Sequence, residues 1–300
     1  MTRQNHTGHT FIVQFPAPLD MPASLDIFRR SGDDGIDRWD GHTLIRTTRV
    51  GNEVIPFTGT IIGSVDSPAM AVTLAHAPHA TAVEQTVRAM FVTAPDALAT
   101  LTVLDPIIAR LEARYPGLRP VSQSDLLTAL IRAISAQQVN LRWATTTRRR
   151  LAEAFGYPHT LGSYQVFSLD AAHLAAADVA ALRALQFTTR KAEYIVALAT
   201  AVATGALNLE ALRHQPDADV IACLTACRGL GRWTAEWFLA RALGRPRVVA
   251  GDLGVRKAVG AAYLNGRLPS EAEVRELTAH WGAAAGVTQQ LLLHALSQGL

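Results

Sequence analysis

The chain has 300 residues, of which 49% are apolar and 18% are charged, and its formal net charge is +3. This composition is sufficient for a substantial buried core and excludes a disordered protein. No apolar run approaches the roughly 18 residues of a membrane span, and the first six residues do not resemble a signal peptide. We therefore expect a cytoplasmic protein that does not act at a membrane.

The N-terminal part, residues 1–100, is predicted to be an α+β domain built on a small antiparallel sheet. Its short apolar runs are typical of strands, and Gly and Pro residues separate them. These runs are residues 10–15, 44–50, 54–62 and 70–75. Val83, Val87 and Met90 have the spacing of one helix face. No residue pattern in this part indicates chemistry.

Residues 101–300 are predicted to form an all-α domain of short helices. Asp105 is expected to begin a helix, and Ser124 or Asp125 to cap the next one. Further helices are expected at residues 139–155, 177–185, 189–204, 217–226, 270–282 and 287–298. The run Arg148–Arg150 is typical of a solvated helix face, with contact to phosphates as the alternative.

The charges are unevenly distributed along the chain. Residues 119–300 carry six more basic than acidic residues, whereas residues 1–118 carry three more acidic than basic residues. The C-terminal part is thus the one suited to a polyanion, although an excess of this size does not by itself indicate DNA.

Two cysteines, Cys223 and Cys227, lie four residues apart on one predicted helix. An iron–sulfur cluster takes four thiolates, so we expect none, and no nearby His or Cys completes a zinc site. Packing in a reducing compartment is the expected role of both thiols. No cofactor for catalysis is expected.

The stretch from Ala226 to Lys257 is the most informative part of the sequence. A helix predicted at 217–226 is followed by Gly229 and Gly231, whose backbone freedom suits a tight reversal, and a second helix begins at Arg232. A Gly-x-Gly turn that opens a helix presents free N–H groups at a positive dipole end, where a phosphate binds well. Many such turns only join two helices.

Asp252 follows the strand-like run 248–250 and precedes apolar residues at helical spacing. An N-cap is a favoured role for Asp, and a carboxylate that faces a pocket beside the hairpin is a compatible second role. Trp233 and Trp237 lie four residues apart on the second hairpin helix and share one face. Indoles at this spacing are more often core residues than a binding platform.

Together these residues resemble the helix-hairpin-helix DNA glycosylase superfamily, and most of all bacterial 3-methyladenine DNA glycosylase II. The resemblance rests on Arg-Gly-Leu-Gly-Arg-Trp-Thr-Ala-Glu-Trp at 228–237 and on residues 114–119, 133–139 and 190–193. Two departures stand out. Arg228 replaces the usual Pro before the first glycine, and residues 282–286 replace an expected Pro-aromatic-Arg segment.

The resemblance implies a base-excision-repair enzyme that acts as a monomer on double-stranded DNA with damaged bases. It would extrude an alkylated purine, such as 3-methyladenine or 7-methylguanine, and hydrolyse its N-glycosidic bond. Asp252 would be the catalytic carboxylate, because a fixed negative charge stabilises the positive charge that develops on the sugar. Trp233, Trp237 and Trp281 would form the base pocket, where stacking and cation–π attraction favour a charged base.

The resemblance also assigns DNA contacts. Gln138 would fill the gap left by the extruded nucleotide, and either Ile27 or Phe28 would reach the pocket rim. The DNA backbone would bind at Arg228, Gly229, Leu230, Gly231 and Arg232. A structural Na⁺ or K⁺ would bind the backbone carbonyls of Thr225, Cys227 and Leu230.

Trp233 stands where bifunctional members of the superfamily hold a nucleophilic lysine. Without an amine no Schiff base forms, so the resemblance implies a monofunctional hydrolase without lyase activity. Two alternatives remain open at this point. One is a glycosylase for neutral deaminated or oxidised bases, and the other is a non-catalytic protein that binds damaged DNA.

Overall fold

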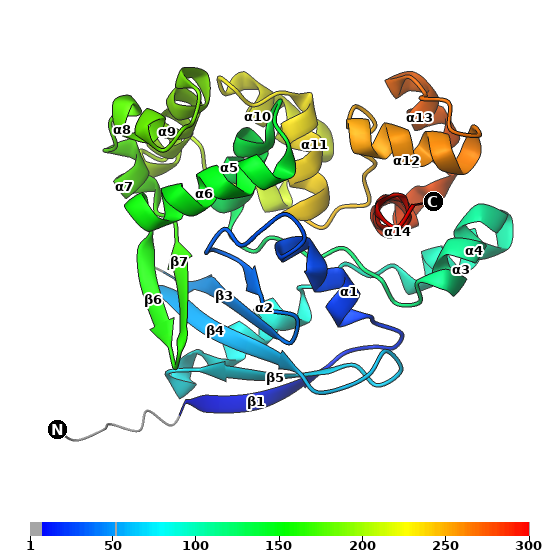
Figure 1. Cartoon of the computed structure of the whole chain (residues 1–300), viewed down its shortest axis with the longest axis horizontal. Helices are drawn as coiled ribbons and strands as arrows, with labels where there is room; N and C mark the ends of the chain where they lie inside the picture. Colours follow the sequence, from blue (N-terminus) through cyan, green and yellow to red (C-terminus); the bar gives the residue numbers. More distant parts are fainter. Residues whose placement is uncertain (1–7, 52, 300) are drawn as a thin grey trace.

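The computed structural model describes residues 8–51 and 53–299. A five-stranded antiparallel sheet near the N-terminus lies against a larger group of helices (Figure 1). The strand order is β1 (His9–Gln14), β5 (Ala69–Leu74), β4 (Glu53–Ile61), β3 (Thr43–Val50) and β2 (Arg38–Trp39). This arrangement confirms the predicted α+β fold class, in which an antiparallel sheet precedes a helical bundle.

One face of the sheet is buried because apolar residues alternate along its strands. In β5 every second residue is buried, and these residues are Met70, Val72 and Leu74. They share one core with residues of α1 (Met21–Leu25) and α2 (Ala80–Arg88). The sheet is therefore a half-buried layer that supports the helices.

The helices form two further cores. The first lies among α5 (Leu126–Ala136), α6 (Leu141–Phe155), α9 (Thr189–Ala203), α10 (Asp217–Ala226) and α11 (Arg232–Arg241). The second lies among α3 (Pro95–Leu104), α4 (Pro106–Arg114), α12 (Leu253–Tyr263), α13 (Glu271–Leu277) and α14 (Ala285–Ser297). The remaining helical elements are α7 (Ala171–Ala175), α8 (Val179–Ala184), η1 (Asp26–Phe28), η2 (Ala77–His79), η3 (Glu210–His214) and η4 (Ala279–Ala284). Among the described residues, no helix combines the length and hydrophobicity needed to cross a membrane.

The structure contains two local elements that the sequence analysis did not predict. A hairpin of β6 (Tyr157–Leu161) and β7 (Tyr164–Ser168) lies within the mainly helical part, and Phe167 N donates to Gly35 O, in the loop before β2, at 2.8 Å. Helix α3 was not predicted, and its last turn exposes Val103 and Leu104. Residues 248–250 lie in the loop before α12 and form no strand, and Val248 and Ala250 pack in the second helical core. The division into residues 1–100 and 101–300 stays a prediction.

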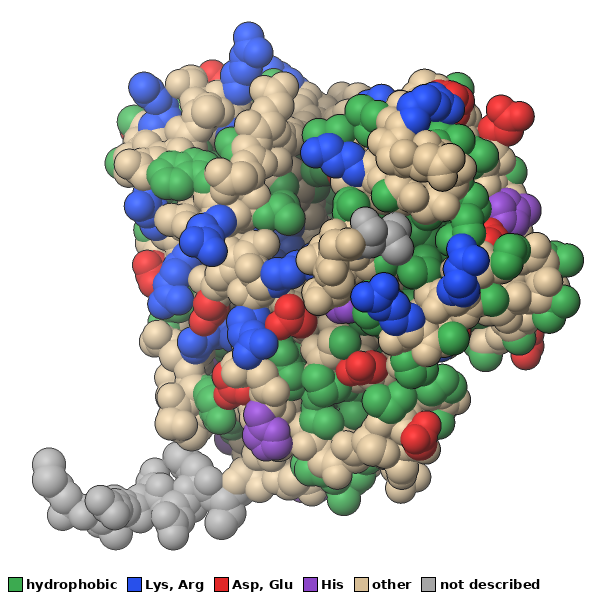
Figure 2. Space-filling view, turned by 45° about the vertical axis from the view of Figure 1, so that its right-hand side comes forward, with side chains coloured by type: hydrophobic (Ala, Val, Ile, Leu, Met, Phe, Trp, Pro, Cys, Tyr) green, Lys and Arg blue, Asp and Glu red, His purple; other side chains and the backbone are tan. Residues whose placement is uncertain are grey.

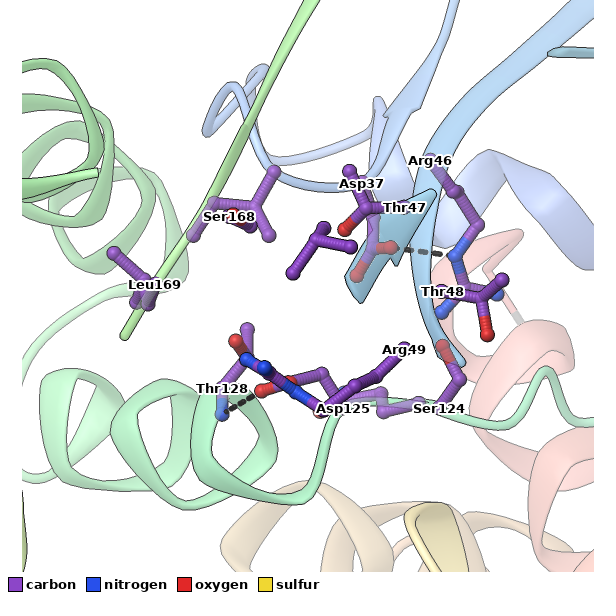
Figure 3. Close-up of a pocket in the computed structure, with 13 residues that line it drawn as sticks. Asp37, Arg46, Thr47, Thr48, Arg49, Ser124, Asp125, Thr128, Ser168 and Leu169 are labelled. Atoms are coloured by element: carbon purple, nitrogen blue, oxygen red, sulfur yellow. Dashed lines mark hydrogen bonds and ion pairs between the residues drawn. The ribbon is translucent and has the colours of Figure 1, made fainter. Parts of the chain in front are cut away.

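Buried charges join the sheet part to the helices. Arg46 Nε on β3 donates to Asp37 Oδ1 at 2.5 Å, and Figure 3 shows this pair from inside the junction. Arg132 on α5 pairs with Asp34 at 2.7 Å and with Asp37 at 2.8 Å. Arg148 on α6 donates to Asp34 Oδ2 at 3.0 Å. The sheet part thus supplies both carboxylates, and the two helices supply two of the three guanidinium groups.

The position of Arg148 corrects the sequence interpretation. Its side chain is buried, so the run Arg148–Arg150 is not a uniformly solvated face, whereas Arg149 is exposed and pairs with Glu153. Helical spacing alone places Arg148 on the inner side, but the carboxylate that stabilises it lies more than a hundred residues away along the chain.

Asp34 should contribute strongly to stability at neutral pH. Burial alone raises the pKa of Asp34, but the charges of Arg132 and Arg148 and a hydrogen bond from Ile36 N outweigh this effect and lower it. Asp34→Asn leaves two buried guanidinium groups short of a counterion, so we expect it to lower the free energy of unfolding by about 3–5 kcal/mol. Urea unfolding at pH 7 measures this difference.

The free energies of unfolding of the wild-type protein and of Asp34→Asn should become equal in acid. Because the folded pKa of Asp34 is depressed, its contribution is present above the unfolded value and declines as pH falls below about 4. Asp33→Asn is the matched control, since the Asp33–Arg38 pair is partly exposed and such pairs contribute about 0–1 kcal/mol. Equal losses for both variants would contradict the stabilising role of Asp34.

Candidate active site

Helix α11 presents two different faces. Ala235, Phe238 and Leu239 are buried in the first helical core, while Trp233 and Trp237 are only half buried. The two tryptophans lie one helical turn apart, so they point to the same side. That side faces the loop before α12, where the second helical core begins. The site therefore lies between two separately packed groups of helices.

The structure places Asp252 against both indoles. Asp252 Oδ2 accepts hydrogen bonds from Trp233 Nε1 at 2.9 Å and from Trp237 Nε1 at 3.3 Å. Its Oδ1 accepts from Val255 N at 3.0 Å and caps the N-terminus of α12. Asp252 is half buried, and no salt bridge involves it among the residues described. The side chain that caps α12 is thus also the one to which both indoles donate.

These hydrogen bonds leave few free acceptor sites on the Asp252 carboxylate. Two carboxylate oxygens offer about four lone-pair sites, of which two on Oδ2 and one on Oδ1 are engaged. The remaining site on Oδ1 is available to a water molecule. Because the donors hold the carboxylate in one orientation, its negative charge is fixed in space before any ligand binds.

A buried glutamate that the sequence interpretation missed holds the surrounding loop. Glu236 is 1% exposed, and its Oε1 accepts from Arg232 at 3.0 Å, Arg275 at 2.9 Å and Arg247 at 3.4 Å. Arg247 belongs to the loop that ends at Asp252. The signal in the sequence was a Glu within an otherwise apolar stretch of helix, but its three partners come from separate segments.

Trp237 already has a cation over its ring. Arg241 Cζ lies 5.3 Å from the centroid of this indole, and Arg241 Nη2 is hydrogen bonded to Gln290 Oε1. Burial and the charge of Arg30 lower the pKa of Arg241 to about 10, although the charge of Asp252 opposes them. Arg241 Nη1 is buried and has no hydrogen-bond partner among the described residues. A base cannot stack on the face of the Trp237 indole that this guanidinium covers.

Trp281 does not join the other two indoles at Asp252. It is 2% exposed, and its Nε1 donates to the hydroxyl of Tyr263 at 3.3 Å. That hydroxyl in turn donates to Asp105, the N-cap of α4. Trp237 packs against the core that contains Trp281. In this arrangement Trp281 offers almost no surface to a base, and its role as a pocket wall stays a prediction.

Gln138 lies at the elbow between α5 and α6. Its side chain is exposed, and its backbone φ of 54° is in the left-handed region that non-glycine residues rarely adopt. Ala136, Gln137, Gln138 and Trp233 line an open pocket of about 250 Å³. The structure therefore brings the predicted gap-filling residue next to one of the two indoles that hold Asp252.

The hairpin presents the open end of α11. Gly229 has φ of 90°, and a Cβ there would lie 2.2 Å from the ring of Tyr194, so this position requires glycine. Gly231 has φ of −92°, and no atom would crowd a Cβ there. The conformational argument therefore holds for Gly229 alone. Gly231 is the N-cap of α11 without a side-chain cap, which leaves N–H groups of the first turn open to an anion.

The hairpin arginines are anchored and still exposed. Arg228 pairs with Glu193 at 2.9 Å, and Arg232 pairs with Glu236 at 3.0 Å. Their side chains are 72% and 57% exposed. Leu230, between the glycines, is buried in the first helical core. On the face that Figure 2 shows, Lys and Arg side chains gather over the helical part, around a hollow between its helices.

The predicted cation site consists of carbonyl groups at the end of α10. The carbonyls of Thr225 and Cys227 belong to the last turn and the C-cap, where helices leave carbonyl oxygens without an intrahelical partner. Cys227 O accepts from Leu230 N at 3.1 Å, which leaves its second lone pair for another partner. With Leu230 O, the donor set is all oxygen and suits a hard monovalent cation. Cys223 and Cys227 themselves pack against the first helical core, as predicted.

The structure distinguishes the two candidates for the pocket rim. Phe28 is 6% exposed and lies under the buried guanidinium groups of Arg46 and Arg132, at 5.3 and 5.8 Å from its centroid. Phe28 is thus a core residue of the junction. Ile27 is only partly buried, so it is the one of the two that retains accessible surface.

A second cavity, shown in Figure 3, lies at the junction of sheet and helices and not at Asp252. It measures about 20 Å³ and is lined by polar residues that include Thr47, Ser124 and Thr128. A water molecule needs roughly 10–15 Å³ of this kind of volume, so the cavity has room for about one water. It is too small for a base.

This combination defines a class of protein: a helix-hairpin-helix unit beside a carboxylate held by indoles, on a bundle that follows an antiparallel sheet. Residues 131–283 match the family described as "HhH-GPD superfamily base excision DNA repair protein". Because the match covers just over half of the chain, the chain belongs to this family.

Individual proteins show the same likeness. The chain is 30% identical over 182 residues to DNA-3-methyladenine glycosylase of Bacillus subtilis, a match that spans 59% of each protein. It superimposes on a 3-methyladenine DNA glycosylase from Archaeoglobus fulgidus with a TM-score of 0.86 at 22% identity, over 97% of this chain and 99% of that one. It also superimposes on an 8-oxoguanine glycosylase/lyase from Clostridium acetobutylicum with a TM-score of 0.73 at 14% identity, over 96% and 98%. These superpositions show the shared fold, which does not identify the substrate.

Proposed function

We propose that this protein is a monofunctional DNA glycosylase that removes alkylated purines, of the 3-methyladenine and 7-methylguanine type, from double-stranded DNA. The observation that carries the proposal is the placement of Asp252, held by two indole N–H groups next to the elbow that exposes Gln138. The named relative from Bacillus subtilis supports the same substrate class.

The proposed reaction begins with extrusion of the damaged nucleotide, because the bond to be cut is inaccessible in the stacked duplex. Gln138 would occupy the gap in the duplex. The N–H groups at the start of α11, with Arg228 and Arg232 beside them, would bind the DNA backbone near the lesion. A monovalent cation on the carbonyls of Thr225, Cys227 and Leu230 would add a positive charge toward a phosphate.

The bond cleavage would then need only one carboxylate. When the N-glycosidic bond breaks, its electron pair goes to the base, and an alkylated purine that already carries a positive charge leaves as a neutral molecule. The sugar becomes oxocarbenium-like, and the fixed charge of Asp252 stabilises it. Water then attacks C1′ and loses a proton, which yields a free base and an abasic site. The lone pair on Oδ1 that Val255 N does not use would orient that water.

Asp252→Asn should abolish most of the base release. The amide keeps the shape of the side chain and still caps α12, but it lacks the negative charge, so we expect a loss of roughly 10²–10³-fold or more in the single-turnover rate. Binding to a duplex with an abasic analogue should change less than about threefold. Release of bases from methylated DNA, followed by chromatography, measures the first quantity, and fluorescence anisotropy measures the second.

Asp219→Asn is the control for this experiment, because Asp219 is an exposed residue in the first turn of α10. It removes the same charge from the same part of the chain, and we expect wild-type rates. Base release by Asp252→Asn at the wild-type rate would rule out the mechanism. A wild-type protein that binds damaged DNA and releases no base would instead indicate the non-catalytic alternative.

Borohydride should not trap the protein on DNA. A covalent adduct requires an amine that attacks the sugar, and Trp233 stands at the hairpin position of the nucleophilic lysine. Lys191 is buried and its Nζ donates to Ser135 O at 2.8 Å, so this amine is engaged inside the protein. Incubation of the protein with damaged DNA and borohydride, followed by denaturing electrophoresis, should show no adduct. An adduct that disappears in Lys257→Ala would contradict monofunctional chemistry.

A second candidate, the release of neutral purines such as hypoxanthine, is favoured by Arg241. Its guanidinium covers one face of Trp237 and has a buried N–H group without a partner. A cation at this position repels a charged base, whereas a donor stabilises negative charge that develops on a neutral leaving base.

Arg241→Met decides between the two substrate classes. If neutral purines are substrates, release of hypoxanthine should fall about tenfold or more in this variant, the effect of one lost charged hydrogen bond. Release of 7-methylguanine should stay within about twofold or increase. Paired single-turnover rates on the two duplexes provide the comparison. A wild-type protein that releases no hypoxanthine excludes the second candidate.

A further inference from the structure

The elbow between α5 and α6 is fixed by hydrogen bonds that come from three separate segments. Gln137 Nε2 donates to Gly229 O in the hairpin at 2.9 Å. Lys191 Nζ on α9 donates to Ser135 O at 2.8 Å, and Arg148 Nη1 on α6 donates to Ser135 Oγ at 2.9 Å. All three contacts fall within three residues of Gln138, whose own side chain is exposed and makes no hydrogen bond among the described residues.

The backbone at Gln138 needs such support. A left-handed φ of 54° in a residue with a Cβ is unfavourable and persists only where the surroundings determine it. On its N-terminal side, Gln137 is hydrogen bonded to the hairpin. On its C-terminal side, Asn140 caps α6 by accepting from Trp143 N at 2.8 Å. Gln138 is thus a strained residue with an exposed side chain, and the chain is anchored on one side of it by Gln137 and on the other by Asn140.

The contact of Gln137 also links the two parts of the molecule that would meet DNA. Gly229, whose carbonyl accepts this bond, packs so closely on the ring of Tyr194 that it cannot carry a Cβ. Figure 1 shows α5 and α6 beside α10 and α11, which the hairpin joins. A hydrogen bond from one segment to the other fixes the distance between the elbow and the N-terminus of α11.

We propose that Gln137 is a positioning residue for Gln138: its hydrogen bond to Gly229 O holds the elbow in the conformation that inserts Gln138 into the duplex. This inference rests on the proposed function and adds a residue to it. Gln137 acts through Gln138, so its loss slows extrusion of the base and leaves cleavage of an extruded nucleotide unchanged.

Gln137→Met tests the proposal, because methionine retains the length of the side chain and lacks the N–H donor. We expect single-turnover release of 7-methylguanine from a duplex to be about tenfold slower, equivalent to about 1.4 kcal/mol in the activation barrier. Gln85→Met is the matched control, since Gln85 is exposed on α2, and it should show the wild-type rate.

A double-mutant cycle with Gln138→Ala separates positioning from a merely structural role. If Gln137 acts through Gln138, the double variant Gln137→Met/Gln138→Ala should be no slower than Gln138→Ala alone, within about twofold. Additive losses would overturn the proposal, as would a wild-type rate for Gln137→Met. If Gln137→Met does not fold, Gln137→Asn, whose amide is too short to reach Gly229 O, replaces it in the same cycle.

A measurement of extrusion distinguishes failure of this inference from failure of the proposed function. In the Asp252→Asn background, a 2-aminopurine next to the lesion should brighten on binding as the stack opens, and Gln137→Met should lower the amplitude or slow the rise. This signal needs no base release. Brightening without release in the wild-type protein would reject the proposed reaction, whereas identical brightening with and without Gln137 would reject the positioning role.

Discussion

The site depends on one interaction, the pair of indole hydrogen bonds to Asp252 Oδ2. A half-buried carboxylate without an adjacent cation is costly unless hydrogen-bond donors stabilise its charge. Trp233 and Trp237 supply these donors from α11, and Val255 N supplies a third from α12. The three bonds connect the two helical cores, as do the contacts of Glu236 with Arg275 and of Arg241 with Gln290.

Charges arranged around this centre keep the loops in place. Buried Glu236 collects Arg232 from the start of α11, Arg247 from the loop before Asp252 and Arg275 from α13. At the junction with the sheet part, Asp34 and Asp37 pair with Arg132 and Arg148. Removal of Asp34 leaves the buried guanidinium of Arg148 without its paired carboxylate. Through these ion pairs the sheet part stabilises the helices that carry the elbow at Gln138.

The fold of this chain also occurs in proteins that are named for different bases. Proteins named for 3-methyladenine and for 8-oxoguanine superimpose on this chain, so the bundle and hairpin do not determine the substrate. Local contacts restrict two tryptophans of this chain. Arg241 covers one face of Trp237, and Trp281 is buried and donates to the hydroxyl of Tyr263, which donates to Asp105.

The sequence by itself determined the elements whose signals are local. Short apolar runs separated by Gly and Pro predicted β3, β4 and β5. Helical spacing and Asp N-caps predicted α4, α5 and α12, and the glycine hairpin with Asp252 gave the predicted centre of the site. Only the tertiary structure decided which side chains meet. It placed Arg148 inside, buried Phe28 while leaving Ile27 partly exposed, directed the Trp281 N–H to Tyr263 and connected Gln137 to Gly229. The physical reason is that an ion pair or a hydrogen bond depends on distances of about 3 Å between segments far apart in the chain, and periodicity along the chain contains no such distances.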